Sequence, residues 1–494
     1  MSTKTCLPAR SSLLQGIALT AMVMASAITT AAGDAAGEDF DYFSANRQLV
    51  RNGVQAVLSC NGLFTSGRSI EQVFDQELAY LGDTVLGTAE GGPYIVHGRE
   101  QAVSVGGDEH GPVVTAAFRR GIGCVVMAPN APLDDIASLP ELTLAYPDGD
   151  PRTLPWPDGD ALAAQVPDDD VDAQALAAAS EWAFNRPTPE QDTLSLLIVH
   201  RGEIVHERYA PGIDMHTRTR TWSTAKSIAA TLIGMQVDAG KMSLDGPLAI
   251  DWLPELRAPG SDPRKTITLR HLLQMSSGLY PVDSFKMEYA TGSGLAYWAG
   301  ASSAENMRKR GLVREPGSYW DYENYDTLLA VYALKQALPD AQSYLEYPRR
   351  ALLDPIGMRS TLLSTDRFGD FILSSQVYTN ARDLARFGLL YLNDGRWNNE
   401  QLVSKAWIDF VRTPAPASAE RGNFYGGQWW LVPDERKGEV PADAYSTAGN
   451  RGQYVIVAPS HDLVIVRRGL DYGKQGFNNW DLLREVIKAF PDAR

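Results

Sequence analysis

Strand-like segments at the two ends of one region constrain the fold of this chain most strongly. Near the start of the region, two β-rich runs in TLSLLIVHRGEIVHERYA flank a turn at residues 201–203, which is typical of a hairpin. Near its end, GQYVIVAP and LVIVRRG flank a second turn at residues 460–462. Segments with helical periodicity lie between the hairpins, and NNWDLLREVIKAF follows them. This order predicts an α+β fold in which an antiparallel sheet, flanked by helices, joins both ends of the region and the intervening helices form an insert.

The length of the chain predicts more than one structural unit. With 494 residues, of which 44% are hydrophobic, the chain exceeds the usual size of a single core. Residues 39–150 are predicted to form an N-terminal accessory unit, with a helix in SIEQVFDQELAYLG and strands in VVTAAFRRGIGCVVMA. Residues 151–190 begin rich in Pro, Gly and Asp and end in an Ala-rich helix, which indicates a linker that wraps towards the main domain at residues 191–494.

The N-terminus has the layout of a secretory signal peptide, which we place at residues 1–32. A basic start precedes an apolar stretch from about residue 13 to residue 28, and small residues follow, with cleavage expected after Ala27 or Ala32. We therefore expect a periplasmic or secreted protein, and an uncleaved anchor is the alternative. No later run approaches the roughly 20 apolar residues of a membrane span, so no stable span is expected after cleavage.

Removal of the signal leaves two cysteines, Cys60 and Cys124. In an oxidising compartment this pair favours one disulfide. Two separate buried thiols are the alternative, because the sequence does not show whether the two positions come within bonding distance. Neither cysteine has a neighbouring His or Cys that indicates a metal site.

Charge and histidine spacing exclude several classes of partner. The formal net charge is −15, and no Lys/Arg-rich run offsets it locally, so no nucleic-acid binding is expected. The seven histidines show no paired-ligand spacing, and His271, within LRHLLQM, is predicted to be structural.

A candidate nucleophile and its base lie at the head of one helical segment, TRTWSTAKSIAATLIGMQ. Ser223 and Lys226 are three residues apart and therefore share one face of a helix. A serine hydroxyl attacks a carbonyl only after a base removes its proton, and a lysine is such a base only where enclosure lowers its pKa from about 10.4 towards neutrality. The apolar neighbours, among them Trp222 and Ile228, indicate such an enclosure. The alternative is that Ser223 caps the helix and Lys226 points to water.

Two further elements fit the same site. EPGSYWDYENYD places Tyr322 and Asn324 two apart in an extended segment, where a phenol relays protons and an amide binds a substrate carbonyl. The Tyr-x-Asn pattern recurs twice, but there Asn380 is predicted to cap a helix and Asn393 to end it. STAGNRGQYVIVAP, which contains Gly449, is a strand entry whose backbone N–H groups suit an oxyanion hole.

Five segments, in this order, resemble the serine β-lactamase and penicillin-binding-protein superfamily. They are STAKS, ITLRHLLQMSSGL, EPGSYWDYEN, TNARDLARFGLLYLNDG and AGNRGQYVIVAPSHDLVIV. They are most similar to the class C-like branch of esterases, D-aminopeptidases and 6-aminohexanoate-dimer hydrolases. The resemblance covers about residues 193–490. It implies a β-lactamase/transpeptidase-like α/β sandwich, with an extra N-terminal unit outside the common domain.

The resemblance also implies an acyl-enzyme mechanism. Ser223 attacks the carbonyl and Lys226 takes its proton, while Tyr322 shares the base role and protonates the leaving group. Asn324 holds Lys226 and the substrate amide, and the backbone N–H groups of Ser223 and Asn450 bind the oxyanion. The resemblance implies neither a metal nor an organic cofactor, and the expected partner is a small or peptide-like amide or ester substrate.

Two positions depart from the family pattern. Glu323 stands where Ser or Ala is usual, and Thr447, Ala448 and Gly449 match a triplet that begins with Lys in β-lactamases and with His in many esterases. The cation that receives a β-lactam or D-alanine carboxylate is therefore missing from the triplet, although Arg451 lies nearby as a substitute. The form of this segment is similar to that of the 6-aminohexanoate-dimer hydrolases.

We therefore expect a secreted serine hydrolase that cleaves an amide or ester bond, similar to 6-aminohexanoate-dimer hydrolases and esterases. A D-alanyl-D-alanine carboxypeptidase or β-lactamase is the first alternative. A non-catalytic sensor that binds peptidoglycan or β-lactams is the second, because the cation is missing, although a sensor needs none of Ser223, Lys226 and Tyr322. No Gly-x-Ser-x-Gly elbow occurs, which disfavours an α/β-hydrolase.

Overall fold

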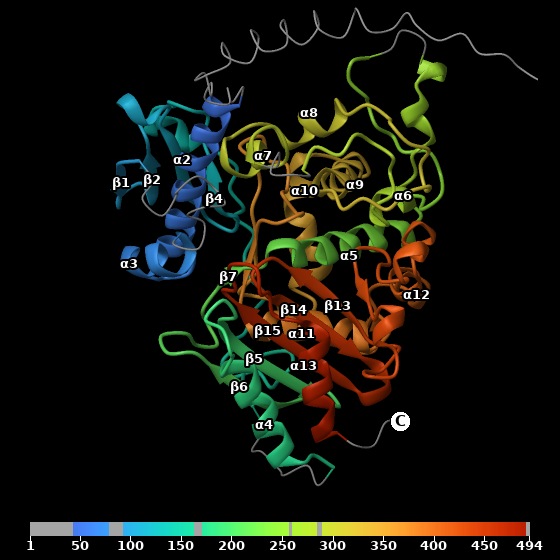
Figure 1. Cartoon of the computed structure of the whole chain (residues 1–494). Helices are drawn as coiled ribbons and strands as arrows, with labels where there is room; N and C mark the ends of the chain where they lie inside the picture. The colour runs from blue at the N-terminus through green and yellow to red at the C-terminus, as the bar shows by residue number, and fades with distance from the viewer. Residues whose placement is uncertain (1–42, 79–91, 163–169, 256–258, 284–288, 491–494) are drawn as a thin grey trace, which may run out of the picture. The chain divides into compact units, whose positions relative to one another are not determined.

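A six-stranded antiparallel sheet joins the two ends of the main domain in the computed structural model (Figure 1). Its strand order is β12-β13-β14-β15-β5-β6. The first predicted hairpin is β5 (Thr193–His200) and β6 (Glu203–Tyr209), and the second is β14 (Gln453–Ala458) and β15 (Leu463–Gly469). Because β15 pairs with β5, the predicted union of the two ends of the domain is confirmed.

The structure describes most of the chain, with gaps. The structure describes residues 43–78, 92–162, 170–255, 259–283 and 289–490. The predicted signal peptide, residues 1–32, lies outside these residues. Residues Ala45–Arg494 form one compact unit.

Helices cover both faces of the six-stranded sheet. Successive side chains of a strand point to opposite faces. Leu196 of β5 packs in one cluster with α4 (Ala173–Phe184) and α13 (Asn479–Val486), and Leu197 packs in the larger core with α11 (Ala381–Leu392). The result is the expected α/β sandwich, with α11 on one side of the sheet and α4 and α13 on the other (Figure 1).

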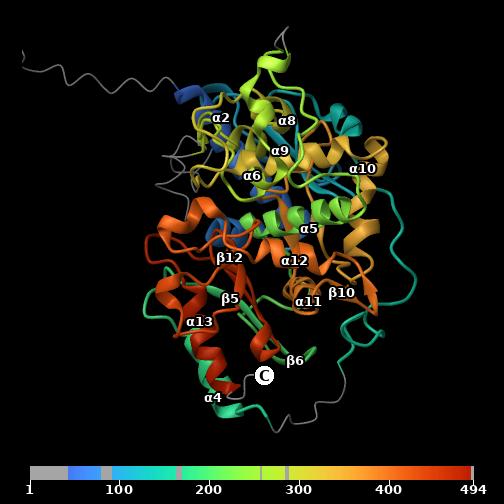
Figure 2. The same cartoon turned by 90° about the vertical axis from the view of Figure 1, so that its right-hand side faces the viewer.

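The central helix of the insert is α5 (Ala225–Asp238), which lies between the sheet and the insert helices at residues 269–273, 303–308 and 324–336 (Figure 2). Every residue from Ala225 to Met235 is buried, as is typical of a helix packed on all sides. α9 (Asn324–Gln336) packs against α5 and against α6 (Leu269–Leu273). The remaining elements are α7 (Gly294–Trp298), α8 (Ser303–Arg308), α10 (Ala341–Pro348), α12 (Lys405–Val411), β7 (Thr219–Arg220), β8 (Leu362–Leu363), β9 (Val377–Thr379), β10 (Arg396–Trp397), β11 (Glu400–Gln401), β12 (Trp430–Leu431) and β13 (Tyr445–Gly449).

The structure confirms the predicted helix ends. The Asn380 side chain accepts a hydrogen bond from the backbone N–H of Asp383 and caps α11, which ends at Asn393. In α6, the backbone N–H of Thr268 donates to Nδ1 of His271, and the Thr268 side chain accepts from the His271 backbone. His271 therefore has the structural role that the sequence predicted.

The N-terminal segment forms a helix, α2 (Ser44–Cys60), and a separate antiparallel sheet in the order β1-β2-β3-β4. The predicted strand-like pieces correspond to β3 (Val114–Arg119) and β4 (Gly123–Val126). The sequence analysis did not predict β1 (Tyr94–His97) and β2 (Ala102–Val105).

The predicted helix in SIEQVFDQELAYLG is shorter than expected. Only α3 (Ile70–Val73) is α-helical, and a π-helical turn at Phe74–Leu78 follows it. Ser69 caps α3 through the backbone N–H of Gln72, as the Ser-x-x-Gln pattern favours. The last residues of the predicted helix lie outside the described part of the chain.

Cys60, at the end of α2, and Cys124, on β4, form a disulfide, with their Cα atoms 6.1 Å apart. The disulfide prediction is therefore confirmed, and the alternative of two separate thiols is wrong. Among the described residues, no helix is both long and apolar enough to cross a membrane.

The double variant Cys60→Ser/Cys124→Ser is expected to unfold more easily than the wild type. The disulfide links residues 64 positions apart, so its removal frees a long loop in the unfolded chain and lowers the free energy of unfolding by about 2–4 kcal/mol. Urea unfolding with and without a reductant measures this change. A reductant should shift the wild type towards the variant and leave the variant unchanged, and equal midpoints for both proteins would contradict the expectation.

Candidate active site

Ser223 lies in a strained turn that leads into α5. The turn is a 3₁₀ segment, Trp222–Thr224, and Trp222 has a φ of +50°. A bulky residue rarely adopts a positive φ, and such strain costs about 1–3 kcal/mol, so it persists where the surrounding structure enforces it. Arg220 stacks on the Trp222 ring at 3.7 Å. Trp222 and Thr224 are buried, whereas Ser223 between them is partly exposed.

Lys226 is enclosed, with 1% of its surface exposed. Its Nζ lies 3.3 Å from Oγ of Ser223. The same nitrogen donates to Oδ1 of Asn324 at 2.7 Å and to the backbone carbonyl of Ser374 at 2.8 Å. The alternative in which Lys226 points to water is therefore wrong. The capping alternative is also wrong, because the N-cap residue of α5 is Thr224, without a side-chain cap.

Asn324 is held by a loop that the sequence did not single out. The Asn324 Nδ2 donates to Oγ of Ser293 at 3.1 Å, and its backbone N–H donates to Oδ2 of Asp283 at 3.1 Å. The other Asp283 oxygen accepts from the backbone N–H of Ser293 at 2.7 Å. Asp283 and Ser293 therefore fix the amide whose oxygen binds Lys226.

Tyr322 lies beside the lysine and belongs to an aromatic cluster. Nζ of Lys226 is 5.0 Å from the centroid of the Tyr322 ring. The ring of Tyr322 also contacts Trp430, with centroids 5.7 Å apart, and Trp430 stacks on Phe424 at 5.8 Å. Tyr322, Phe424 and Trp430 are only partly buried, whereas Trp320 and Tyr425 behind them are buried. The lysine thus has an apolar aromatic wall on one side.

Gly449 packs directly on the turn that carries Ser223. A Cβ at this position would lie 2.1 Å from the carbonyl oxygen of Thr221 and 3.2 Å from the backbone nitrogen of Thr224. Only glycine permits this approach. The end of β13 is therefore packed against the turn that carries Ser223, and Asn450, the predicted oxyanion donor, is the next residue along the chain.

Thr447 reinforces this contact and faces the helix. Its Oγ1 accepts from Oγ1 of Thr224 at 3.0 Å and from the backbone N–H of Val455 at 3.0 Å. The nearby Arg451 is buried and its Nη1 bonds with Oε2 of Glu77 at 3.0 Å. The guanidinium of Arg451 therefore binds the N-terminal segment inside the protein. The suggestion that Arg451 replaces the missing cation of the triplet is wrong.

Glu323 is buried in a charged cluster behind the site. Its Oε1 accepts from the backbone N–H of Asp283 at 3.2 Å, and its Oε2 lies 3.7 Å from Nη2 of Arg310. Arg310 also pairs with Asp326 at 2.8 Å. Burial and the charge of Asp283 raise the pKa of Glu323 to about 8, although Arg310 opposes this. Glu323 thus helps to hold the residues that position Asn324, and it does not line a cleft.

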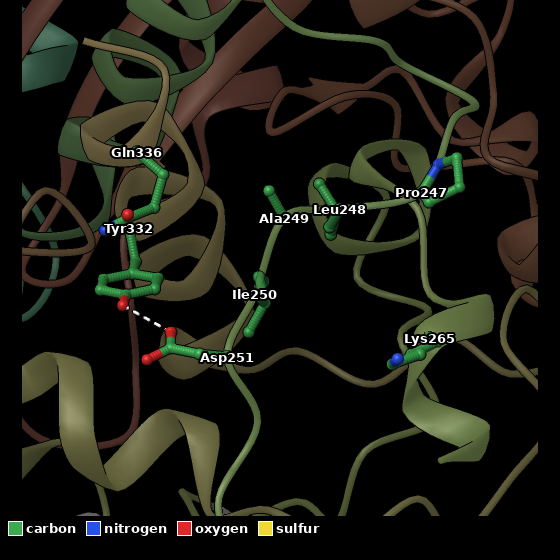
Figure 3. A pocket seen from close by; sticks show the side chains of 8 residues that line it. All are labelled: Pro247, Leu248, Ala249, Ile250, Asp251, Lys265, Tyr332 and Gln336. Carbon is green, nitrogen blue, oxygen red and sulfur yellow. Dashed lines mark hydrogen bonds between the residues drawn. The ribbon is translucent and has the colours of Figure 1, made fainter. Parts of the chain in front are cut away.

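Two surface hollows on the described part of the chain lie away from the candidate catalytic residues. One, of about 510 Å³, is lined by the segment from Pro247 to Asp251 together with Lys265, Tyr332 and Gln336 (Figure 3). The Tyr332 hydroxyl donates to Oδ1 of Asp251 at 2.7 Å across it. None of the candidate catalytic residues lines this hollow. Among the described residues, no three His, Cys, Asp or Glu side chains gather as metal ligands.

The comparison with protein families identifies the class of the chain. The profile of the Beta-lactamase family matches residues 185–467. The chain therefore belongs to the β-lactamase family and is a serine hydrolase of that family, with the β-lactamase/transpeptidase-like fold.

Individual relatives are distant. An uncharacterized protein of Alkalihalophilus pseudofirmus is 26% identical over 304 residues, which cover 58% of this chain and 86% of that protein. A 6-aminohexanoate-dimer hydrolase of Paenarthrobacter ureafaciens is 24% identical over 294 residues, which cover 56% of this chain and 72% of that protein. The crystal structure of a candidate β-lactamase from Bacteroides dorei matches with a TM-score of 0.51 and 21% identity, covering 65% of this chain and 100% of that one. The structural likeness supports the fold alone.

The stability of the wild type is expected to fall as the pH rises from about 5 to 8, and Glu323→Gln should remove part of this fall. The folded state raises the pKa of Glu323 to about 8 from its ordinary value of 4.5, so in this window the folded chain binds more protons than the unfolded chain. The free energy of unfolding of the wild type, relative to the variant, should decrease by roughly 3 kcal/mol.

Urea unfolding at several pH values measures this difference. Glu315→Gln, at an exposed position on the preceding loop, is the matched control and should keep the pH dependence of the wild type. Parallel pH profiles for the wild type and Glu323→Gln would show that Glu323 is not the titrating group.

Proposed function

We propose that this chain is a secreted or periplasmic serine hydrolase that cleaves an amide or ester bond through an acyl-enzyme on Ser223. One observation carries the proposal. The buried Nζ of Lys226 lies 3.3 Å from Oγ of Ser223 and donates to two pure acceptors, Oδ1 of Asn324 and the carbonyl of Ser374. A neutral amine has two N–H donors and one lone pair. In this neutral form the two N–H groups match the two acceptors, and the lone pair is the part of the amine that takes the proton of Ser223.

The first chemical step is acylation. Oγ of Ser223 attacks the carbonyl carbon of the substrate, its proton passes to Nζ of Lys226, and the carbonyl oxygen becomes an oxyanion. The backbone N–H groups of Ser223 and Asn450 stabilise this oxyanion. The packing of Gly449 against Thr221 supports this assignment, because it sets the two backbone segments side by side.

The second step expels the leaving group. Lys226 now carries the proton of Ser223 next to the ring of Tyr322. As the bond to the carbonyl carbon breaks, the phenol gives its proton to the leaving nitrogen or oxygen, and the proton of Lys226 passes to the phenol oxygen. A water molecule then attacks the acyl carbon and gives one proton to the base formed by Tyr322 and Lys226. The bond between this carbon and Oγ breaks, the proton returns to Oγ, and the acid product leaves Ser223 in its initial state.

The residues around the site favour a substrate without a lactam ring. Thr447 stands where β-lactamases have a cation, and its hydroxyl is bonded inside the protein to Thr224. The aromatic wall of Tyr322, Phe424 and Trp430 suits an apolar acyl or leaving group. The relative from Paenarthrobacter ureafaciens, a 6-aminohexanoate-dimer hydrolase, supports amide cleavage of this kind.

Two further features of the molecule bear on localisation and on the sensor alternative. The disulfide between Cys60 and Cys124 supports export to an oxidising compartment, since such bonds are rare in the cytosol. The strained turn at Ser223 and the enclosed amine of Lys226 argue against a non-catalytic sensor, because binding alone requires neither.

Labelling with a fluorophosphonate probe tests the nucleophile and its base. The mature wild type should gain the mass of one probe, and Ser223→Ala should gain none. Lys226→Met should react about 10²- to 10⁴-fold more slowly, because no base removes the serine proton. Lys241→Met, an exposed lysine beyond α5, is the matched control and should react like the wild type. Equal labelling of Ser223→Ala and the wild type would overturn the proposal.

Hydrolysis of nitrocefin distinguishes the second candidate function, a β-lactamase or D-alanyl-D-alanine carboxypeptidase, which the family membership favours. We expect p-nitrophenyl acetate to be cleaved and nitrocefin to be cleaved at least about 10³-fold less efficiently in kcat/KM, because Thr447 provides no cation for the β-lactam carboxylate. Comparable efficiencies for the two substrates, both abolished in Ser223→Ala, would establish the second candidate instead.

A further inference from the structure

Glu77 is a buried carboxylate from the N-terminal segment, far in sequence from the matched family region at residues 185–467. It lies in the π-helical turn after α3, and 4% of its surface is exposed. Its Oε1 accepts from Nη2 of Arg68 at 2.7 Å, and its Oε2 accepts from Nη1 of Arg451 at 3.0 Å. A buried ion pair of this kind becomes strongly destabilising when one partner is removed.

Arg451 connects Glu77 to the proposed oxyanion hole, because it is the residue after Asn450 in the turn between β13 and β14. Its φ is +63°, an unusual value for a long side chain. The guanidinium also donates to the carbonyl oxygens of Gln76 and Leu470, both at 2.8 Å, and Nε donates to that of Asp471 at 3.1 Å. These bonds fix the backbone conformation of the turn.

The charge of Glu77 also acts on Arg468, which binds the segment just before Ser223. Arg468, buried on β15, donates to the backbone carbonyls of Thr219 and Arg220, just before the nucleophile. Burial lowers the pKa of Arg468 to about 9, and the negative charge of Glu77 opposes this decrease. Burial also raises the pKa of Glu77, but the charges of Arg68 and Arg451 outweigh it and hold that pKa below its usual value.

We propose that Glu77 is a positioning residue of the active site, through which the N-terminal segment holds the β13–β14 turn and aims the backbone N–H of Asn450 at the oxyanion. This role rests on the proposed function of Ser223 as the nucleophile. Loss of the carboxylate removes the ion pair between Glu77 and the buried guanidinium of Arg451, so the strained turn relaxes. A displacement of about 1 Å at such a site costs up to roughly 100-fold in rate.

The experiment compares Glu77→Gln with Asp75→Asn, which removes an exposed carboxylate two residues away. The concentration of active Ser223 is first titrated with the fluorophosphonate probe, and kcat and KM for a p-nitrophenyl ester are then expressed per labelled site. Glu77→Gln should lower kcat roughly 10- to 100-fold with little change in KM, and Asp75→Asn should match the wild type. A lower folded fraction alone would reduce the titrated concentration and leave kcat per site unchanged.

A thionoester substrate tests whether the defect lies in the oxyanion hole. The larger sulfur fits poorly between donors placed for oxygen, so the wild type should prefer the ester over the matching thionoester. This preference should shrink in Glu77→Gln. The double variant Glu77→Gln/Arg451→Gln should be no slower than the slower single variant, because both changes break one linkage.

Unchanged kcat per labelled site and an unchanged ester preference in Glu77→Gln would overturn the role of Glu77. If Glu77→Gln does not fold, Glu77→Asp, which keeps the charge and shortens the side chain, is measured in the same way with the same criteria. Absence of labelling at Ser223 in the wild type is a different outcome, because it removes the proposed function itself.

Discussion

The burial of one amine is the constraint on which the site depends. Lys226 lies inside the protein with 1% of its surface exposed, at the junction of the sheet, the insert and the segment before β9. Its hydrogen bonds to Asn324 and to the carbonyl of Ser374 replace water, and the hydroxyl of Ser223 is the third neighbour. Burial disfavours a charged amine, and the proposed role of Lys226 as a base requires the neutral one.

Several strained residues hold the elements of the site together. Trp222 and Arg451 have positive φ values next to Ser223 and Asn450, and Gln428 has a φ of +64°. The Gln428 carbonyl accepts from the Ser227 hydroxyl of α5, and its side-chain oxygen accepts from the Thr327 hydroxyl of α9. Strain of this kind is maintained only by the surrounding fold, and its concentration near Ser223 is typical of a functional site.

The sequence predicted the strands, motifs and helix caps that depend on a local pattern of residues. The β-rich runs of β5 and β15, the Ser-x-x-Lys spacing and the caps of α11 each involve residues close together in the chain. Contacts between distant segments leave no such pattern: Ser374 reaches Lys226 across 148 positions and Arg451 reaches Glu77 across 374. The buried position of Glu323 was missed for the same reason, because its partner Arg310 lies on another loop.

The proposed mechanism requires that the amine of Lys226 is uncharged before the substrate binds. Nuclear magnetic resonance of the mature protein with isotope-labelled lysines measures this charge, and the variant Lys226→Arg assigns the resonance of Lys226. Lys226 should show the chemical shift of a neutral amine at pH 7, while exposed lysines such as Lys241 show that of an ammonium. An ammonium shift for Lys226 at pH 7 and above, in protein that the fluorophosphonate probe still labels, would contradict it.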